Sequence, residues 1–468
     1  MRKTFIGPRL RQLRLQRKQT QAEMAKAINV SPAYVTMLEN NQRSLSVQVL
    51  IAIEEAYGVN WRDLVHDDQT SLLAELRATF QDPLFPGDAP DIQEMRSAID
   101  HAPRLVEQIL HLYKSHRTTL EHMMRAGEDR RSGELVQSSP ETIIHDFFRD
   151  HKNHFDELER AAERLRKEEP FEADEILIAL KRRLKNKHNV TVRLRSVDDM
   201  PGALRIFDRE RSELLLSEAL DHQNRTFQLA HMLALVELDD ILKRLIADSG
   251  ISSEIGVARC QIELANYFAA AFLMPYDDFL KAARNTRYDI DRLAAGFDVS
   301  FEQACHRLTT LQRRGAEGVP FFFLRIDKAG NVTKRFNSTT FQLAEYGGSC
   351  PVWNIHTTFQ TPGLIVPQFV ETPDGDRFFT ISRTTDRPAF SQETQDRRLA
   401  LALGCKLEHA GSLGYAQRFN VEEEDIFSHI GISCSLCPRT ACAQRAHQPA
   451  VVDLQIDTDR RGDTRYES

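Results

Sequence analysis

The sequence predicts a multidomain protein: an all-α N-terminal domain, an α+β middle domain and an α+β C-terminal domain. Three observations support this. Short helical patterns separated by capping and turn signals fill residues 1–68, brief apolar strands mix with helical patterns in residues 141–312, and two hairpin signals follow in residues 313–468. Residues 69–140 hold broken helical patterns and end in a polar Gly/Ser/Pro stretch, so we expect a helical linker there.

Length and composition fit ordinary globular domains. The 468 residues allow about three domains, and 41% hydrophobic with 28% charged residues is a typical balance. The chain has no run of about 18 apolar residues, and its basic first residues lack the apolar core of a signal peptide. We therefore expect a cytoplasmic protein with no membrane partner.

The charge is unevenly distributed. The chain carries a net charge of −7, yet residues 1–18 contain seven Arg or Lys and no acidic residue. A basic segment on an acidic protein indicates a local site for a polyanion, although a solvated helix face would give the same charge pattern.

The pattern around the end of this segment predicts a helix-turn-helix. Thr20 caps a helix, and Glu23 three residues later completes a capping box. A short turn at residues 29–30 separates this helix from the next, which Ser31 caps and Pro32 begins. Short helices with such a turn between the second and the third are typical of DNA-binding domains.

The residues of this region resemble the phage-repressor (Cro/C1, XRE) family over residues 7–66. The resemblance implies that Arg14 and Glu39 form a buried ion pair between the first and third helices and that Gln21 lies at a DNA phosphate. The motif that carries it is Thr20-Gln21-x-x-x-Ala25 followed by Ser31-x-x-Tyr34-Val35-x-x-Leu38-Glu39-Asn40.

The third helix is expected to enter the major groove of double-stranded operator DNA, bound by a homodimer or a higher homo-oligomer. Its exposed positions offer no bidentate donor, so base readout would use thymine methyl groups or DNA shape; a plain helix surface is the alternative. Asn40 and Arg43 are expected at phosphates. The candidate DNA-binding residues are Gln21, Ser31, Pro32, Ala33, Tyr34, Thr36, Met37, Asn40 and Arg43.

The stretch RTFQLAHMLALVE reads like the metal-binding helix of a zinc peptidase that has lost its chemistry. Such a helix carries H-E-x-x-H, in which two histidines bind Zn2+ and the Glu activates water. His231 is the first histidine, but Met232 replaces the Glu and Leu235 replaces the second histidine. We therefore expect no catalytic residue and no enzyme activity. The strands predicted before this helix are residues 190–196, 203–208 and 213–218.

Residues 263–275, ELANYFAAAFLMP, together with these strands and this helix, resemble the ImmA/IrrE metallopeptidase family. The resemblance implies a zincin-like middle domain in which Glu263 has the position of the third zinc ligand. We expect His231 to be a hydrogen-bonded core histidine rather than a ligand. A former catalytic cleft without its metal would remain a concavity able to bind a small molecule.

Three cysteines are grouped near the C-terminus, at Cys434-x2-Cys437-x4-Cys442. In a cytosolic protein this spacing indicates a metal site, so the C-terminal domain is predicted to be α+β with a Cys metal site holding a 4Fe-4S iron–sulfur cluster or Zn2+. Buried free cysteines are the alternative. Cys405 is the best candidate for a fourth ligand; the weaker ones are Cys350, His409 and His447.

The order of these parts, with the GGSCPxW motif at residues 347–353, resembles the short-chain fatty acyl-CoA transcriptional regulator family. The resemblance implies a transcription factor that responds to acetyl- or propionyl-CoA and controls short-chain fatty acid assimilation genes. A CoA pocket needs basic residues with aromatic or apolar walls. Residues of suitable type near the motif are Arg325, Trp353, His356 and Arg383.

Two other functions stay open from the sequence. The first is a redox- or metal-responsive transcription factor that uses the C-terminal cysteines. The second is a DNA-tethered metallopeptidase that cleaves a repressor, which the residues at Met232 and Leu235 argue against.

Overall fold

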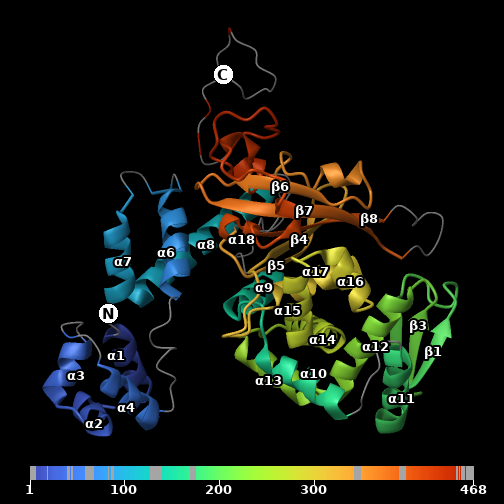
Figure 1. The fold of residues 1–468 in the computed structure, drawn as a ribbon, viewed down its shortest axis with the longest axis horizontal. Helices are drawn as coiled ribbons and strands as arrows, with labels where there is room; N and C mark the ends of the chain where they lie inside the picture. The colour runs from blue at the N-terminus through green and yellow to red at the C-terminus, as the bar shows by residue number, and fades with distance from the viewer. Residues whose placement is uncertain are drawn as a thin grey trace. The chain divides into compact units, whose positions relative to one another are not determined.

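The computed structural model of the protein has two compact units, Met1–Gly133 and Glu134–Ser468 (Figure 1). It describes residues 7–17, 19–39, 43, 46–57, 68–82, 84–85, 89–126, 140–168, 175–341, 349–388, 397–449, 452, 454 and 459. In this described part of the chain, the first unit contains only helices and the second contains both β-sheets.

The N-terminal helices form the predicted helix-turn-helix. The Thr20 hydroxyl accepts a hydrogen bond from the Glu23 backbone, and the Glu23 carboxylate accepts one from the Thr20 backbone at 2.7 Å, so the capping box is confirmed. The turn before the third helix passes through Asn29, whose φ of 54° is left-handed. Leu10 and Val35 lie in the shared core. The helices are α1 (Gly7–Gln16), α2 (Gln21–Ala27), α3 (Pro32–Glu39) and α4 (Val47–Tyr57).

Three further helices lie in the described residues of the first unit. They share an apolar core of their own that includes Leu76, Ile99 and Leu110. In its described residues, the segment expected to be a helical linker contains helices that pack on one another. They are α6 (Asp68–Phe80), α7 (Ile92–His101) and α8 (Pro103–Ala126).

The second unit begins with helices and a three-stranded sheet. The three predicted strands are confirmed as β1 (Thr191–Arg195), β2 (Arg205–Asp208) and β3 (Glu213–Ser217). Their order is β1-β3-β2, with β1 parallel and β2 antiparallel to β3. The helices are α9 (Pro140–Asp150), α10 (Asp156–Glu168), α11 (Ile176–His188), α12 (His222–Glu237), α13 (Asp239–Asp248), α14 (Glu254–Leu273), α15 (Tyr276–Asn285), α16 (Ile290–Gly296) and α17 (Phe301–Thr309).

A six-stranded sheet follows, in the order β5-β4-β8-β7-β6-β9. Both predicted hairpins are confirmed, β4 with β5 and β6 with β7. The central strand β8 was not expected from the sequence. The strands are β4 (Phe322–Ile326), β5 (Val332–Asn337), β6 (Val366–Glu371), β7 (Arg377–Asp386), β8 (Arg398–Lys406) and β9 (Phe427–His429), and the short helix α18 (Leu407–Ala410) follows β8.

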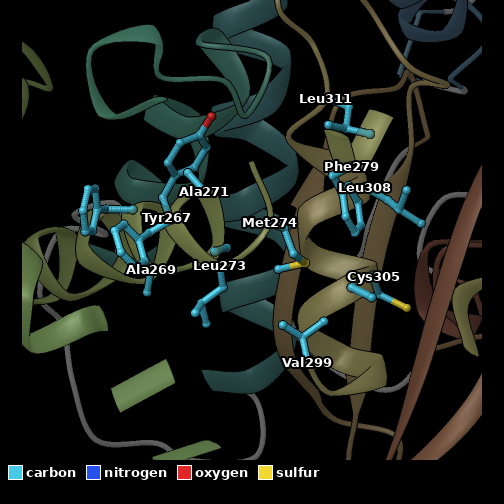
Figure 2. Close-up of a cluster of buried hydrophobic side chains, with 14 of the residues drawn as sticks. Tyr267, Ala269, Ala271, Leu273, Met274, Phe279, Val299, Cys305, Leu308 and Leu311 are labelled. Carbon is cyan, nitrogen blue, oxygen red and sulfur yellow. The ribbon is translucent and has the colours of Figure 1, made fainter. Parts of the chain in front are cut away.

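The two faces of this sheet belong to different cores. Phe323 and Leu403 face the helices and join the cluster that also contains Met274 on the loop after α14 and Leu308 on α17 (Figure 2). Phe322 faces the other side, where loops carrying Trp353 cover the sheet. Because one hydrophobic cluster crosses residues 312–313, the expected middle and C-terminal domains share a core.

One ion pair is fully enclosed in this unit. Arg307 on α17 donates to both carboxylate oxygens of Glu159 on α10, at 2.6 and 2.9 Å. The Tyr267 hydroxyl donates to the same carboxylate at 2.7 Å, and Arg307 also donates to the Met274 carbonyl at 2.9 Å. Burial opposes ionisation, but Arg307 and Tyr267 together hold the pKa of Glu159 below its usual range.

No helix in the described ranges combines the length and the apolar composition needed to cross a bilayer.

Candidate functional site

The helix-turn-helix is braced by an ion pair between its first and third helices. Arg14 donates from Nε to Glu39 Oε1 at 2.6 Å and from Nη2 to Glu39 Oε2 at 3.0 Å, which is a bidentate geometry. A third donation, to the Gln19 carbonyl at 3.0 Å, connects the same guanidinium to the loop before α2. The buried Arg14–Glu39 pair implied by the family resemblance is present.

Gln21, which is expected at a phosphate, makes two hydrogen bonds inside the domain. Its amide nitrogen donates to Glu39 Oε2 at 2.7 Å, and its amide oxygen accepts from the Thr36 hydroxyl at 3.1 Å. The same hydroxyl donates to the Pro32 carbonyl at 3.0 Å. Gln21 therefore positions α3, and Thr36 is less available to a base than expected.

The start of α3 is exposed to solvent. Pro32 and Ala33 are exposed, and Met37, one turn after Ala33, is partly exposed on the same side of the helix. Ser31 caps the helix by accepting from the Tyr34 backbone at 3.2 Å. The Arg43 guanidinium lies 5.2 Å from the centre of the Tyr34 ring, a cation–π arrangement. Asn40, the remaining candidate, lies outside the described residues.

His231, on α12, is held as a neutral core histidine. Its side chain is buried, and Nδ1 lies 2.5 Å from Nη1 of Arg205 on β2. A guanidinium can only donate, so Nδ1 accepts and carries no proton. Burial, then the charges of Arg205 and Lys334, lower the pKa of His231 to about 3, despite a hydrogen bond to the Ile262 backbone.

Glu263, at the position of the third zinc ligand, is paired with a lysine from the six-stranded sheet. Lys334 Nζ on β5 lies 3.2 Å from Glu263 Oε2, and Asn266 donates to the same oxygen at 3.4 Å. Met232 is buried and Leu235 packs against the core cluster. Among the described residues, no group of three or more His, Cys, Asp or Glu side chains is placed to hold a metal ion.

The former cleft is almost filled. The space left beside Glu263 has a volume of about 30 Å³, room for a few water molecules. Lys334 and Phe336 of β5 line it from one side, and His306 of α17 from another. The expectation of an open concavity is therefore not met here, because side chains of the C-terminal sheet occupy it.

The cysteine candidates are divided by the sheet. The pKa of the Cys350 thiol is raised, chiefly by burial. The nearby Cys434 and Cys437 also raise this pKa, and hydrogen bonds from the backbone oppose the change. Cys405 belongs to the opposite face, in the cluster with the helices, where burial raises its pKa to about 12. Cys350, and not Cys405, is thus placed with the C-terminal cysteines. Cys442 lies on the same C-terminal loop as Cys434 and Cys437. Arg445 stabilises this loop by donating to the Cys434 carbonyl at 3.4 Å.

The four candidate ligand-binding residues do not converge on one pocket. Trp353 is buried on the loop-covered face, donating to the Thr380 hydroxyl at 3.3 Å, and His356 contacts the Ser349 hydroxyl at 2.9 Å. On the helix-covered face, Arg325 donates to Glu302 at 2.6 Å, and Arg383 pairs with Asp291 and lies over the Phe301 ring. The sheet separates the two pairs, and each side chain already has a partner.

A larger hollow lies elsewhere in the second unit, and the sequence did not indicate it. Its volume is about 500 Å³, and it lies where α15 and the loop after it meet the segment that follows β8. Three basic residues line it: Arg284, Arg287 and His409. The lining residues are Arg284, Arg287, Tyr288, Glu317, Gly318, Val319, His409, Gly411 and Ser412.

The braced helix-turn-helix on a chain whose peptidase-like domain has lost its ligand set defines a class of protein. It is a DNA-binding transcriptional regulator with a peptidase-like domain.

Comparison with known proteins agrees. Residues 10–64 match the helix-turn-helix model, residues 185–309 the IrrE N-terminal-like domain, and residues 310–466 the model described as short-chain fatty acyl coenzyme A regulator, C-terminal. The chain is 36% identical to the propionyl-CoA carboxylase regulator of Cereibacter sphaeroides over 466 residues, covering 99% of each chain.

Two further relatives come from Mycobacterium tuberculosis. HTH-type transcriptional regulator RamB is 34% identical, with 98% of each chain covered, and HTH-type transcriptional regulator PrpR is 36% identical, with 95% of this chain and 92% of the relative covered. A solved M. tuberculosis transcriptional regulator matches with a TM-score of 0.66 and 36% identity, covering 70% of this chain and 100% of that chain. The chain therefore belongs to the short-chain fatty acyl coenzyme A regulator family.

Proposed function

We propose that this regulator binds operator DNA as a homodimer and that a short-chain acyl-CoA changes its affinity for DNA. The observation that carries the proposal is the match of residues 310–466 to the acyl coenzyme A regulator model on the same chain as a helix-turn-helix. One relative is named for propionyl-CoA carboxylase, so we expect target genes in short-chain fatty acid assimilation. Because operators are chromosomal, the protein would act in the cytoplasm.

DNA recognition is assigned to the start of α3. Pro32, Ala33 and Met37 offer apolar contacts to thymine methyl groups, and Arg43 offers a charge for a phosphate. One such module reads only a short half-site, which supports a dimer on a two-fold related site. Gln21 would act through Thr36 and Glu39, which it contacts.

The effector site is assigned to the hollow beside α15. Its volume of about 500 Å³ lies within the range of small-molecule pockets, about 300–1,000 Å³. CoA carries phosphates, which arginines bind well. Arg284 donates to the Glu317 carbonyl at 2.7 Å, whereas Arg287 has no ion-pair partner among the described residues. Among the described residues, Arg287 is thus the arginine of this pocket whose side chain has neither a hydrogen bond nor an ion pair.

We also propose that this protein has no peptidase activity. Met232 and Leu235 remove the general base and one ligand, and Arg205 and Lys334 engage the two side chains that remain. Chelator-sensitive cleavage of a partner protein by the wild-type chain would overturn this assignment.

The test is operator-DNA binding by the full chain, titrated with acetyl-, propionyl- and butyryl-CoA. We expect at least one acyl-CoA to change the affinity for DNA where free CoA does not, and Arg287→Glu to remove the response. Arg292→Glu, on the exposed side of α16, is the matched control. Calorimetry showing no acyl-CoA affinity above that for free CoA would remove the effector, and operator binding by a chain lacking residues 1–68 would remove the DNA assignment.

A second candidate function is a metal- or thiol-responsive regulator, favoured by the place of Cys350 beside Cys434 and Cys437. Thiolates this close are stabilised by a cation or by an iron–sulfur cluster. Gly431 permits the close packing, because a Cβ there would lie 2.7 Å from Cys437 Sγ. Metal analysis with a visible spectrum separates a cluster from zinc, and full alkylation of the native thiols without bound metal would exclude both.

A further inference from the structure

Two side chains remain at the positions that hold zinc in the peptidase family, and each is met by a cation from elsewhere in the chain. Arg205 of β2 donates to His231 at 2.5 Å, and Lys334 of β5 lies 3.2 Å from Glu263. The Lys334 and Glu263 side chains are largely shielded from solvent, with 18% and 28% exposed. A carboxylate in such a place needs a positive partner, which in a zinc peptidase is the metal ion.

The residues present do not fit zinc. A catalytic zinc site uses three protein ligands, and Leu235 offers none. The ammonium of Lys334 lies 3.2 Å from Glu263, and its charge also lowers the pKa of His231, so a divalent cation near these two side chains would be repelled. A neutral imidazole offers a metal one nitrogen lone pair, and on His231 that lone pair, at Nδ1, already accepts from Arg205.

We propose that Lys334 takes the electrostatic place of the missing metal and locks strand β5 into the former peptidase cleft. The lock joins the edge strand of the six-stranded sheet to α14, so the old catalytic centre has become an attachment point between the two halves of the second unit. This inference rests on the geometry of the cleft and is independent of the proposed effector.

The neighbours of Lys334 support a seated strand. Lys334 and Phe336 are two residues apart on β5 and therefore face the same side. The Lys334 Nζ lies 5.1 Å from the centre of the Phe336 ring. The same ring packs against Phe148 of α9, with centres 5.9 Å apart, and against His306 of α17, with centres 5.0 Å apart. The strand thus inserts a cation and an aromatic ring together.

The test restores the zinc ligands and asks whether Lys334 excludes the metal. Zinc affinity is measured for the full chain carrying Met232→Glu and Leu235→His, and for the same chain that also carries Lys334→Ala. Zinc bound by the unmodified protein is subtracted as background. We expect removal of Lys334 to raise zinc affinity at least about tenfold, a size typical of groups around a bound metal. Lys281→Ala, an exposed lysine on α15, is the matched control and should leave zinc affinity unchanged.

Equal zinc affinity with and without Lys334, including no binding by either protein, would overturn the proposal. A double-mutant cycle tests the lock without any metal. We expect Lys334→Met to lower the urea midpoint clearly in the wild-type background and much less in the Glu263→Gln background, since the charge partner is then already lost. Strictly additive losses in this cycle would equally overturn it.

Discussion

The helix-turn-helix and the peptidase-like domain both keep the outline of a polar site, but they satisfy it differently. In the first, Arg14 and Gln21 converge on Glu39 beneath α3, and the exposed start of the helix is left open. In the second, each remaining polar side chain is paired by a cation of the same chain and the cleft is filled. The difference teaches that a retained motif indicates an external partner only where its outer surface stays free.

The buried charges of the two domains show the same contrast. Arg14 keeps 11% of its side chain exposed, whereas Arg307 keeps none, and both pair with a glutamate of which 3% or less is exposed. The first pair braces a surface that must meet DNA, and the second holds a closed core. Four substitutions test this contrast, from the largest expected effect to the smallest.

Glu159→Ala should have the largest effect. It leaves the Arg307 guanidinium buried without its partner, which costs about 3–5 kcal/mol of unfolding free energy. Urea unfolding of the full chain measures the loss. Glu157→Ala is the matched control, because its Arg244 pair lies in solvent and such pairs contribute about 0–1 kcal/mol. Equal losses for both variants would break the distinction between closed and open sites.

Glu39→Gln should have a smaller but still clear effect. It weakens the charge-assisted bonds from Arg14, each worth about 1.5–3 kcal/mol with a charged group. We expect lower stability of the N-terminal domain and weaker operator binding, since α3 loses its brace. Glu23→Gln, on the exposed capping box, is the control. Unchanged operator affinity in Glu39→Gln would show that the brace does not serve the DNA surface.

His306→Phe should change the pH dependence of stability. Burial, then the charges of Lys334 and Arg325, lower the pKa of His306 well below its usual range. Below about pH 6.5 the unfolded chain therefore binds a proton that the folded chain does not, and stability falls as the pH falls. As the pH falls, the free energy of unfolding of the variant should decrease less steeply than that of the wild-type protein, by up to about 1.4 kcal/mol per pH unit.

Urea midpoints between about pH 7 and about pH 5 measure this slope. The surface substitution His222→Phe is the matched control for replacing a histidine. A slope identical to that of the wild-type protein would show that the filled cleft does not exclude the charged imidazole.

Arg43→Ala should have the smallest effect and lower stability by no more than about 1 kcal/mol, the value of an exposed cation–π contact such as the one with Tyr34. Because Arg43 is assigned to a phosphate, its loss should weaken binding to all DNA sequences alike. The slope of log affinity against log salt concentration should become shallower by about one unit. Met37→Ala is the companion variant, expected to alter preference at one base pair. Fluorescence anisotropy at several salt concentrations measures both, and a sequence-selective effect of Arg43→Ala would reverse the assigned roles.

Local signals in the sequence were sufficient for most of the elements. The Thr20 capping box, the turn at Asn29, the strands before His231 and both hairpins involve residues close along the chain. The central strand β8 was missed because its buried run has no turn partner and pairs with distant strands. Lys334 and Arg205 were missed for the same reason, since only tertiary packing brings them to Glu263 and His231.

The candidate site residues followed the same rule. The Arg14–Glu39 pair came from a family motif with fixed geometry, and the structure contains it. The choice of Cys405 over Cys350 used spacing alone, which cannot tell the two faces of a sheet apart. The same limit applied to Trp353 and Arg383, which belong to opposite faces.

The pairing of β4 with β8 also sets an order of assembly during synthesis. Phe322 pairs with Gly404, so the sheet lacks its centre until the ribosome has passed β8. At roughly 5–20 residues per second, on the order of tens of seconds separate the completion of α4 from that of β8. The helix-turn-helix depends on local contacts and forms early. Each newly made chain therefore completes its DNA-binding helices well before its six-stranded sheet.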